Sequence, residues 1–331
     1  MRIETILVKE YQLYKSSNRR YSVHKEPHTA KSVNRKITWD RARQWPLLRI
    51  LLGCSAIVVP LLVALPALDW LKKEIPLVGR ISHAISLTNL LTMVLAILAY
   101  RFYVSRVERR PVIEFAARGA FLELFGGVLL GAAMFTLTLA ILWMTGYYRL
   151  TGMGAWGVLF PAAMAAANAA ITEELIFRGV IFRISEQASG TWLALIISAA
   201  LFGAVHFLNP GAGLQGAVSI MLEAGVFLAA AFLLKRRLWF PIGAHFAWNF
   251  TQGGIFGLAV SGRKSASLLQ GEVSGPLWIS GGVFGLEASV AAIAICFLVA
   301  MLLLLRAAKN GMWVKAPWTR TSLARNDRQT I

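Results

Sequence analysis

Charge and cysteine are both scarce in this sequence. Charged residues make up 15% of its 331 positions and hydrophobic residues 57%, whereas about a quarter of the residues in soluble globular domains are charged. The two cysteines, Cys54 and Cys296, each lie within a long apolar run, which argues against a disulfide framework and against a thiolate zinc site. A composition this poor in charge excludes water as the only solvent of the chain.

Acidic residues are the scarcer charged type, because 34 Lys and Arg outnumber 16 Asp and Glu and give a formal net charge of +18. Such a surplus can indicate a nucleic-acid-binding protein. Here the basic residues cluster in the two tails and in short segments between apolar runs, as they do in polytopic membrane proteins. We therefore expect membrane lipid, and no nucleic acid, as a partner.

The N-terminus lacks the pattern of a secretory signal, which has a short charged segment, an apolar core and a small-residue cleavage site. Residues 1–46 are basic and polar, so we expect a mostly disordered cytoplasmic arm followed by an uncleaved membrane anchor. The arm either lies near anionic lipid or is a soluble tail that sets the topology. Residues 307–331 predict a second basic cytoplasmic tail.

Long apolar runs are abundant. A helix needs about 20 apolar residues to cross a hydrocarbon core about 30 Å thick. Runs near this length predict an all-α fold, a polytopic membrane helix bundle with about eight transmembrane helices within residues 47–306. They lie at 47–68, 84–104, 122–144, 155–184, 192–208, 213–234, 241–260 and 286–305. The fourth run is interrupted by polar residues, and the seventh is rich in glycine.

The segment Val107–Phe121 combines apolar and charged residues between the second and third runs. It predicts a helix lying in the membrane interface, with apolar side chains towards lipid. Four charged side chains would then face water: Arg109, Arg110, Glu114 and Arg118.

The fourth run carries three charged residues, Glu173, Glu174 and Arg178. Each charge near the middle of the membrane costs about 2.5 to 3.5 kcal/mol on insertion scales, so this helix must face protein or water rather than lipid. Glu174 and Arg178 are four residues apart and share a helical face, whereas Glu173 points elsewhere. The simplest alternative is an intrahelical salt bridge with a spare acid that pairs with another helix.

Two further spans carry polar residues that could serve either packing or chemistry. His206 ends the fifth run, and His245 and Asn249 lie four apart on the seventh. Each alone is consistent with hydrogen bonding between helices. Together with the fourth-run acids they supply a carboxylate and an imidazole to activate water, and further donors for an oxyanion. With straight helices, however, His206 lies near the outer end of its span and His245 near the cytoplasmic end.

These motifs, Glu173-Glu174-x-x-x-Arg178, Phe202-x-x-x-His206 and His245-x-x-x-Asn249, resemble the three signature motifs of the CAAX protease and bacteriocin-processing family of intramembrane proteases. The order and spacing agree, and the likeness extends over about residues 120–260. The family includes prenyl-protein endopeptidases, which remove the last three residues of prenylated CAAX tails.

The resemblance implies a catalytic set of Glu173, His206, His245 and Asn249. Glu173 and His206 would position and activate water, and Asn249, helped by His245, would form the oxyanion hole. The Glu174–Arg178 pair would order the site or the substrate. A metal-free glutamic mechanism is favoured, although Glu173, His206 and His245 could also ligate zinc. Glu223 belongs to none of the motifs and is expected to pair with Arg178 or a nearby donor.

The sequence therefore predicts an integral, multi-pass membrane endopeptidase of the plasma or inner membrane. Its substrate would be a lipidated or membrane-anchored polypeptide. Two other functions remain open on the sequence alone. One is a proton-coupled membrane carrier that uses intramembrane Glu and His as a relay, and the other is a catalytically inactive scaffold or immunity protein.

The topology can be tested with reporter fusions. Under an eight-helix scheme, most basic segments fall on one side, which places both termini in the cytoplasm. These segments are the N-terminal tail, Arg106–Arg110, Lys235–Arg237 and the tail after Arg306. Reporters at both ends should give the cytoplasmic signal, and opposite locations would show that the helix count is wrong by an odd number.

Overall fold

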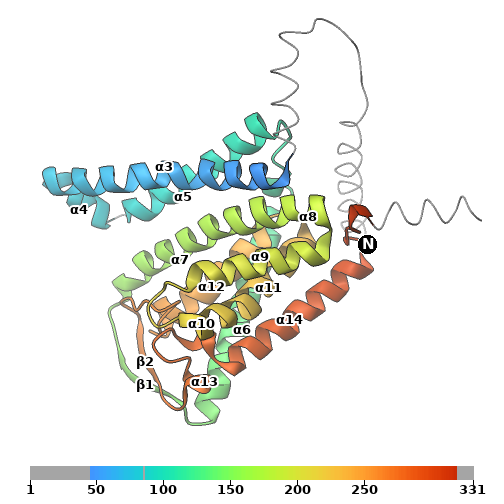
Figure 1. The fold of residues 1–331 in the computed structure, drawn as a ribbon. Helices are drawn as coiled ribbons and strands as arrows, with labels where there is room; N and C mark the ends of the chain where they lie inside the picture. Colours follow the sequence, from blue (N-terminus) through green and yellow to red (C-terminus); the bar gives the residue numbers. More distant parts are fainter. Residues whose placement is uncertain (1–44, 85, 319–331) are drawn as a thin grey trace, which may run out of the picture.

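The computed structural model describes residues 45–84 and 86–318, which form a helical bundle with a single small antiparallel sheet at one end (Figure 1). The proposed arm at 1–46 lies outside this part of the chain except for its last two positions, as does the tail from 319 onwards. The predicted all-α membrane bundle is confirmed.

The helices follow the apolar runs in chain order. The bundle contains α3 (Pro46–Glu74), α4 (Pro76–Ala84), α5 (Leu87–Phe102), α6 (Ala120–Met144), α7 (Leu159–Glu174), α8 (Arg183–Ser189), α9 (Thr191–His206), α10 (Gly213–Ile220), α11 (Val226–Lys235), α12 (Trp239–Asn249), α13 (Leu277–Ser280) and α14 (Val290–Lys309). Short 3₁₀-helices are η3 (Ile113–Phe115), η4 (Trp156–Val158) and η8 (Leu286–Ala288), and π-helical turns are η2 (Tyr103–Val107), η5 (Leu175–Phe182), η6 (Met221–Gly225) and η7 (Phe250–Ile255).

Five helices of the described chain are long and apolar enough to cross a membrane: Pro46–Glu74, Leu87–Val107, Ala120–Met144, Gly213–Lys235 and Val290–Lys309. The other three predicted runs also contain helices, but these are shorter or carry charge. α7 continues through η5 into α8 with the acids and arginines of the fourth run, whereas α9 is 16 residues long and α12 is 11. The last helix begins at Val290, later than the sequence predicted.

Glycines bring α6 and α12 into backbone contact. Gly127 and Gly131, four residues apart on α6, face α12, and a Cβ atom at Gly131 would lie 2.1 Å from the carbonyl oxygen of Ala244. Gly243 on α12 approaches α6 equally closely. Small residues at this spacing allow membrane helices to approach without intervening side chains. The contact fixes the position of α12, and therefore of His245.

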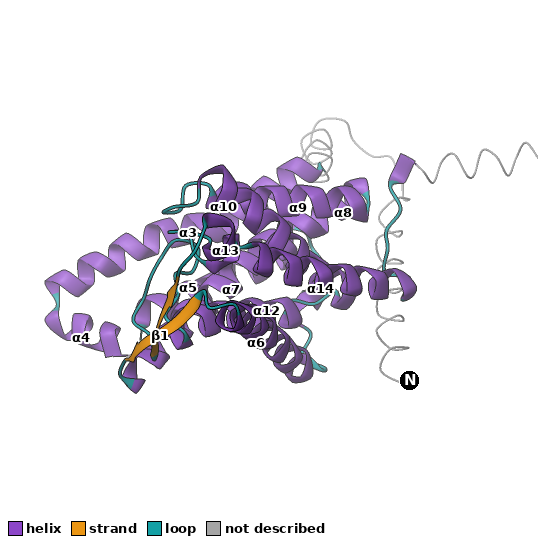
Figure 2. Cartoon of the chain, turned by 90° about the horizontal axis from the view of Figure 1, so that it is seen from below, coloured by secondary structure: helices purple, strands orange, loops and turns teal. Residues whose placement is uncertain are grey.

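The strands lie at the end of the bundle away from α8. β1 (Tyr148–Met153) pairs antiparallel with β2 (Leu269–Val273), with an irregularity in register between Leu150 and Gly152. Figure 2 shows the two strands side by side at one end of the bundle. Backbone hydrogen bonds from Leu268 to Gly254 and from Gly271 to Phe256 join the second strand to the end of η7. The sheet therefore ties these segments together at one end of the helices.

The interface helix predicted at Val107–Phe121 is not formed. Only η3 is helical in its central part, because Pro111 removes a backbone donor and Gly119, with φ 76°, starts α6 in a left-handed conformation. Glu114, expected to face water, is 1% exposed. Its carboxylate pairs with Arg110 at 2.8 Å. The charges of this segment thus point inward to partners that the sequence alone did not reveal.

Glu108 is the centre of that inward-facing charge cluster. Its carboxylate accepts hydrogen bonds from Arg49 of α3 at 2.6 Å, Arg183 of α8 at 2.7 Å and Arg110 at 2.9 Å. Burial alone would raise the pKa of Glu108, but the three guanidinium groups outweigh burial and lower the pKa to about 2. One carboxylate therefore joins the α3–α5 pair of helices to α8.

Replacing this carboxylate should loosen the bundle. A Glu108→Gln variant leaves Arg49 without its carboxylate and leaves Arg110 and Arg183 with Glu114 alone. The shift of the pKa from 4.5 to about 2 corresponds to a loss of folding free energy on the order of 3 kcal/mol. The pKa is lower in the folded protein, so the wild type should exceed the variant in free energy of unfolding by the full amount above pH 4.5. This difference should disappear as the pH falls through about 2.

Thermal melts in detergent at several pH values would measure this difference. The exposed pair of Arg149 and Glu272, at 3.5 Å, offers the control. Glu272→Gln should melt like the wild type. If Glu108→Gln also melts like the wild type at neutral pH, the cluster does not hold α3 to α8.

Candidate active site

A fully buried ion pair forms the base of the site. Arg178 donates from Nη1 to Oε1 of Glu174 at 2.8 Å, and both side chains are 0% exposed. Nη2 of Arg178 donates to the carbonyl oxygens of Ala224 at 3.0 Å and Gly225 at 3.2 Å. Its guanidinium also lies 4.6 Å from the centre of the Phe202 ring. The predicted pairing across one helical turn is confirmed, and Arg178 additionally joins α7 to η6 and α9.

His245 lies between the two acids. Its Nδ1 is 3.0 Å from Oε1 of Glu174, and its Nε2 is 3.8 Å from Oε2 of Glu173. Since a carboxylate can only accept, Nδ1 carries the proton of the Glu174 hydrogen bond. The Glu173 side chain is 30% exposed, against 0% for Glu174. Glu174 is thus committed to Arg178 and His245, while Glu173 remains accessible.

His206 is oriented by its own helix. Its Nδ1 donates to the carbonyl oxygen of Phe202 at 2.7 Å, because that oxygen has no proton to give. In the neutral imidazole, Nε2 is then left as an acceptor. The ring of Phe202 lies 4.8 Å from that of His206 and 6.3 Å from that of His245. Phe202 therefore packs against both imidazoles.

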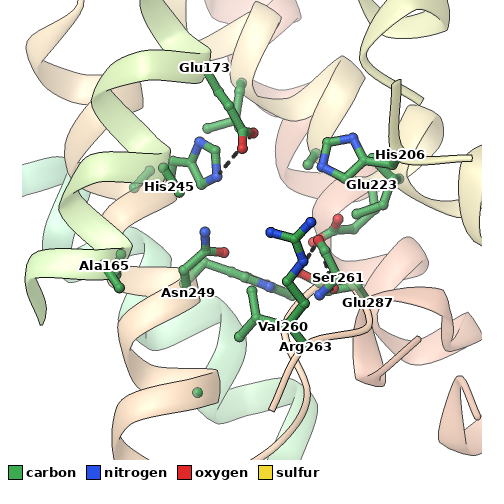
Figure 3. A pocket seen from close by; sticks show the side chains of 18 of the residues that line it. Ala165, Glu173, His206, Glu223, His245, Asn249, Val260, Ser261, Arg263 and Glu287 are labelled. Atoms are coloured by element: carbon green, nitrogen blue, oxygen red, sulfur yellow. Dashed lines mark hydrogen bonds and ion pairs between the residues drawn. The ribbon is translucent and has the colours of Figure 1, made fainter. Parts of the chain in front are cut away.

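The four candidate catalytic residues line one cavity of about 280 Å³. Figure 3 shows Glu173 and His245 on one wall, Asn249 below them and His206 on the opposite wall. The first wall comes from α7 and α12, and the second from α9 and η6. The Ala-rich face of α7 completes the lining with Ala162, Ala165, Ala166 and Ala169. Small side chains there leave the space that the cavity occupies.

The sequence predicted that His206 and His245 lie at opposite ends of their spans, but both line the same cavity. The position at which α12 begins accounts for this difference. The turn before α12 is held against α8, since Arg236 Nη2 donates to Glu186 at 3.0 Å. α12 begins three residues after Arg236, at Trp239, and Nδ1 of His245 lies 3.0 Å from Oε1 of Glu174. The turn thus starts α12 deep enough for His245 to reach the acids.

Three π-helical turns follow or contain candidate site residues. η5 follows Glu174, η6 contains Glu223 and η7 follows Asn249. π-Helical segments are rare and occur frequently at functional sites, because the wider turn re-aims neighbouring side chains. No sequence pattern indicated them in advance.

Sequence reasoning missed two polar parts of the cavity. Glu287 and the turn containing Ser261 and Arg263 also line it, although no motif marks them. Two features of the sequence could have indicated them. Glu287 is an acid at the start of the last apolar run, and Ser261 and Arg263 belong to the polar stretch Ser-Gly-Arg-Lys. Glu223 lines the cavity as well, but it does not pair with Arg178 as one expectation had it. It accepts a hydrogen bond from Sγ of Cys296 at 3.4 Å, so the expected nearby donor is a thiol.

Whether the site could bind zinc depends on how its possible ligands are grouped. Within the described residues, no three His, Cys, Asp or Glu side chains are grouped so that they could hold a metal ion. The set of Glu173, His206 and His245 named from the sequence does not form such a group in this conformation. We therefore derive no catalytic step through zinc.

The fold and the cavity define a class of protein: an integral membrane helix bundle with acids and imidazoles gathered between its helices. Residues 154–251 match the family model described as type II CAAX prenyl endopeptidase Rce1-like. This segment contains all three motifs and confirms the predicted resemblance to the CAAX protease family. The family supports a peptidase of the CAAX type. Comparison with curated proteins gave no match, and neither did comparison with solved structures.

Removing Arg178 should destabilise the protein as well as the site. Arg178→Ala leaves Glu174 buried without its cation, and breaking one partner of a buried pair costs about 3 to 5 kcal/mol. The melting temperature in detergent should fall, and a Glu174→Gln/Arg178→Ala double variant should recover part of the loss. Arg149→Ala, in an exposed pair, is the control. An unchanged melt for Arg178→Ala would mean that Glu174 is hydrated or otherwise paired.

Proposed function

We propose that this chain is an intramembrane endopeptidase that hydrolyses a peptide bond in a lipidated or membrane-anchored polypeptide. The observation that carries the proposal is the shared cavity of Glu173, His206, His245 and Asn249. These residues come from three separate helices of an apolar bundle. Gathering them costs insertion energy, which favours a chemical role over packing.

Glu173 is the proposed general base. It is the more accessible of the two adjacent acids, and within the described chain its Oε2 accepts no hydrogen bond. The Glu173 carboxylate lines the cavity, where it can accept a proton from a water molecule. The Nε2 lone pair of His206 faces the same space and would orient the water as a second acceptor. Attack of the water oxygen on the carbonyl carbon then forms a tetrahedral intermediate.

Asn249 and His245 are the proposed oxyanion donors. The Asn249 side-chain amide can donate to the developing oxyanion. His245 donates from Nε2 as well when it is an imidazolium, a form that suits a ring placed between Glu173 and Glu174. The proton held by Glu173 passes to the leaving amine as the carbon–nitrogen bond breaks. One water molecule is consumed, and an acid and an amine are released.

The proposed roles predict different losses from two substitutions. Glu173→Gln keeps nearly the same size but cannot take the water proton, so turnover should collapse while substrate binding survives. Asn249→Ala should lower turnover by about 100- to 1,000-fold if it removes one oxyanion donor. Purified enzyme with an internally quenched, lipid-anchored peptide would measure both, with Glu272→Gln as the control for a carboxylate outside the cavity.

Metal analysis of the same preparations tests the glutamic mechanism. Activity should survive prolonged chelation, with no stoichiometric zinc in the protein. One zinc per chain, with activity lost on stripping and restored by zinc, would replace this mechanism with a metalloprotease. If cleavage survives in Glu173→Gln, the residue is not the base. Proteomics of membrane-protein termini with wild type and Glu173→Gln would identify the substrate.

A further inference from the structure

Two buried acids that belong to none of the three motifs line the cavity. Glu223 lies on η6 and is 2% exposed, whereas Glu287 lies on η8 and is 3% exposed. Figure 3 shows both on the side of His206, across the cavity from His245. Their carboxylates are close enough to repel each other. Two acids so deep in an apolar bundle need compensation, either by a bound proton or by a positive group.

Uncharged groups are the only donors to this pair within the described chain. Sγ of Cys296 donates to Oε1 of Glu223 at 3.4 Å. Ser261 donates its backbone N–H to Oε2 of Glu287 at 2.6 Å and its hydroxyl to the same oxygen at 3.3 Å. No hydrogen bond reaches Oε2 of Glu223, although that oxygen is buried. These contacts orient the two acids but supply no positive charge, and one acceptor remains free.

Arg178 packs beside Glu223 without pairing with it. Its Nη2 donates to the carbonyl oxygens of Ala224 and Gly225, the two residues that follow Glu223. Its Nη1 donates to the carboxylate of Glu174. The charge of Arg178 is thus balanced by Glu174 and not by Glu223.

The other positive groups at the cavity also lie apart from the pair. His245 is on the opposite wall, where its ring nitrogens face the two acids of α7. Arg263 and Lys264 line the edge of the cavity and are exposed. Across residues 45–84 and 86–318, no ion pair joins either of them to Glu223 or Glu287. The negative charge of the pair is therefore available to a ligand.

The surroundings of the pair fit an alkylammonium ion. A primary ammonium group is compact and has three hydrogen-bond donors, so it can bond to Oε2 of Glu223 and to Glu287 at once. The lining beside Glu223 is apolar and includes Ile220, Ala224 and Phe227. Such a surface can pack against the alkyl stem that carries the charge.

We propose that Glu223 and Glu287 form a subsite for a primary ammonium group of the polypeptide that the enzyme cleaves. This inference rests on the proposed peptidase function. The ammonium group has two sources, a lysine side chain near the scissile bond and the amino group that hydrolysis releases. In either case it replaces the proton that the pair holds when the subsite is empty.

Matched substrates test the first source. Lipid-anchored, internally quenched peptides would carry lysine at one of the positions on either side of the scissile bond. Their partners would carry norleucine, which has an alkyl chain but no charge. At one position or more, wild-type enzyme should cleave the lysine peptide about 10- to 100-fold better in kcat/KM, mainly through a lower KM.

Product inhibition tests the second source. The downstream product of the norleucine peptide would be added to the reaction with a free or an acetylated amino terminus. The free form should inhibit about 10-fold more strongly or better, because only it carries the ammonium charge.

Substitutions connect either effect to the two acids. Glu223→Gln and Glu287→Gln each keep nearly the same size and remove one carboxylate, so each should bring the ratio between charged and uncharged forms close to one. The ratio is measured within a single variant, so it does not depend on how much activity that variant retains. Glu272→Gln, an exposed acid on β2 outside the cavity, should keep the wild-type ratio.

The results separate the inference from the peptidase proposal. A lysine preference supports the side-chain source, and stronger inhibition by the free amine supports the product source. If the wild type cleaves the norleucine peptides but shows neither effect, the subsite does not exist and the peptidase proposal stands. An effect that survives in both Glu223→Gln and Glu287→Gln also overturns the inference. Wild-type enzyme that cleaves no peptide refutes the peptidase proposal and the inference together.

Discussion

The buried pair of Glu174 and Arg178 is the interaction on which the arrangement of the site depends. Two charges inside an apolar bundle are tolerated only when each has its partners. Arg178 meets this need by bonding to Glu174 and to two carbonyl groups at η6, and by lying over Phe202. Those contacts place α7, α9 and the sixth apolar run around one point.

The same pair explains why adjacent acids behave differently. Oε1 of Glu174 accepts hydrogen bonds from Arg178 and from Nδ1 of His245, so this acid positions those two side chains. Glu173 is the preceding residue of the helix, so its side chain is rotated by about 100° from that of Glu174 and lines the cavity. A single turn of helix thus provides one structural carboxylate and one that is available for chemistry.

A second set of charges joins α3, α8 and two connecting segments of the bundle. Glu108 binds three arginines from α3, α8 and the loop between the second and third apolar runs, and Arg236 binds Glu186. Like Glu174, these acids are satisfied by arginine, whose planar group can bond in several directions at once. The positive surplus of the sequence is therefore used partly inside the protein, and not only in the tails and loops.

The sequence alone determined the class of fold, because long apolar runs separated by basic segments have few solutions besides a helix bundle in a membrane. It also identified Glu173, Glu174, Arg178, His206, His245 and Asn249, since charged or polar residues are costly there. The pairing of Glu174 with Arg178 followed from helix geometry, because residues four apart lie on one face.

Only the tertiary structure decided which of those residues meet. The depth at which α12 begins is set by Arg236 and by the glycines of α6, neither of which is visible as a periodic signal. Within residues 107–121, Glu108 binds Arg183, which is remote in sequence. The local pattern could not show this contact, so it predicted an interface helix that does not form. Glu287 and Arg263 reach the cavity wall only in the folded chain, where the backbone N–H of Ser261 donates to Glu287. Helix periodicity encodes local faces, whereas depth, partners and turn conformation come from contacts between segments remote in sequence.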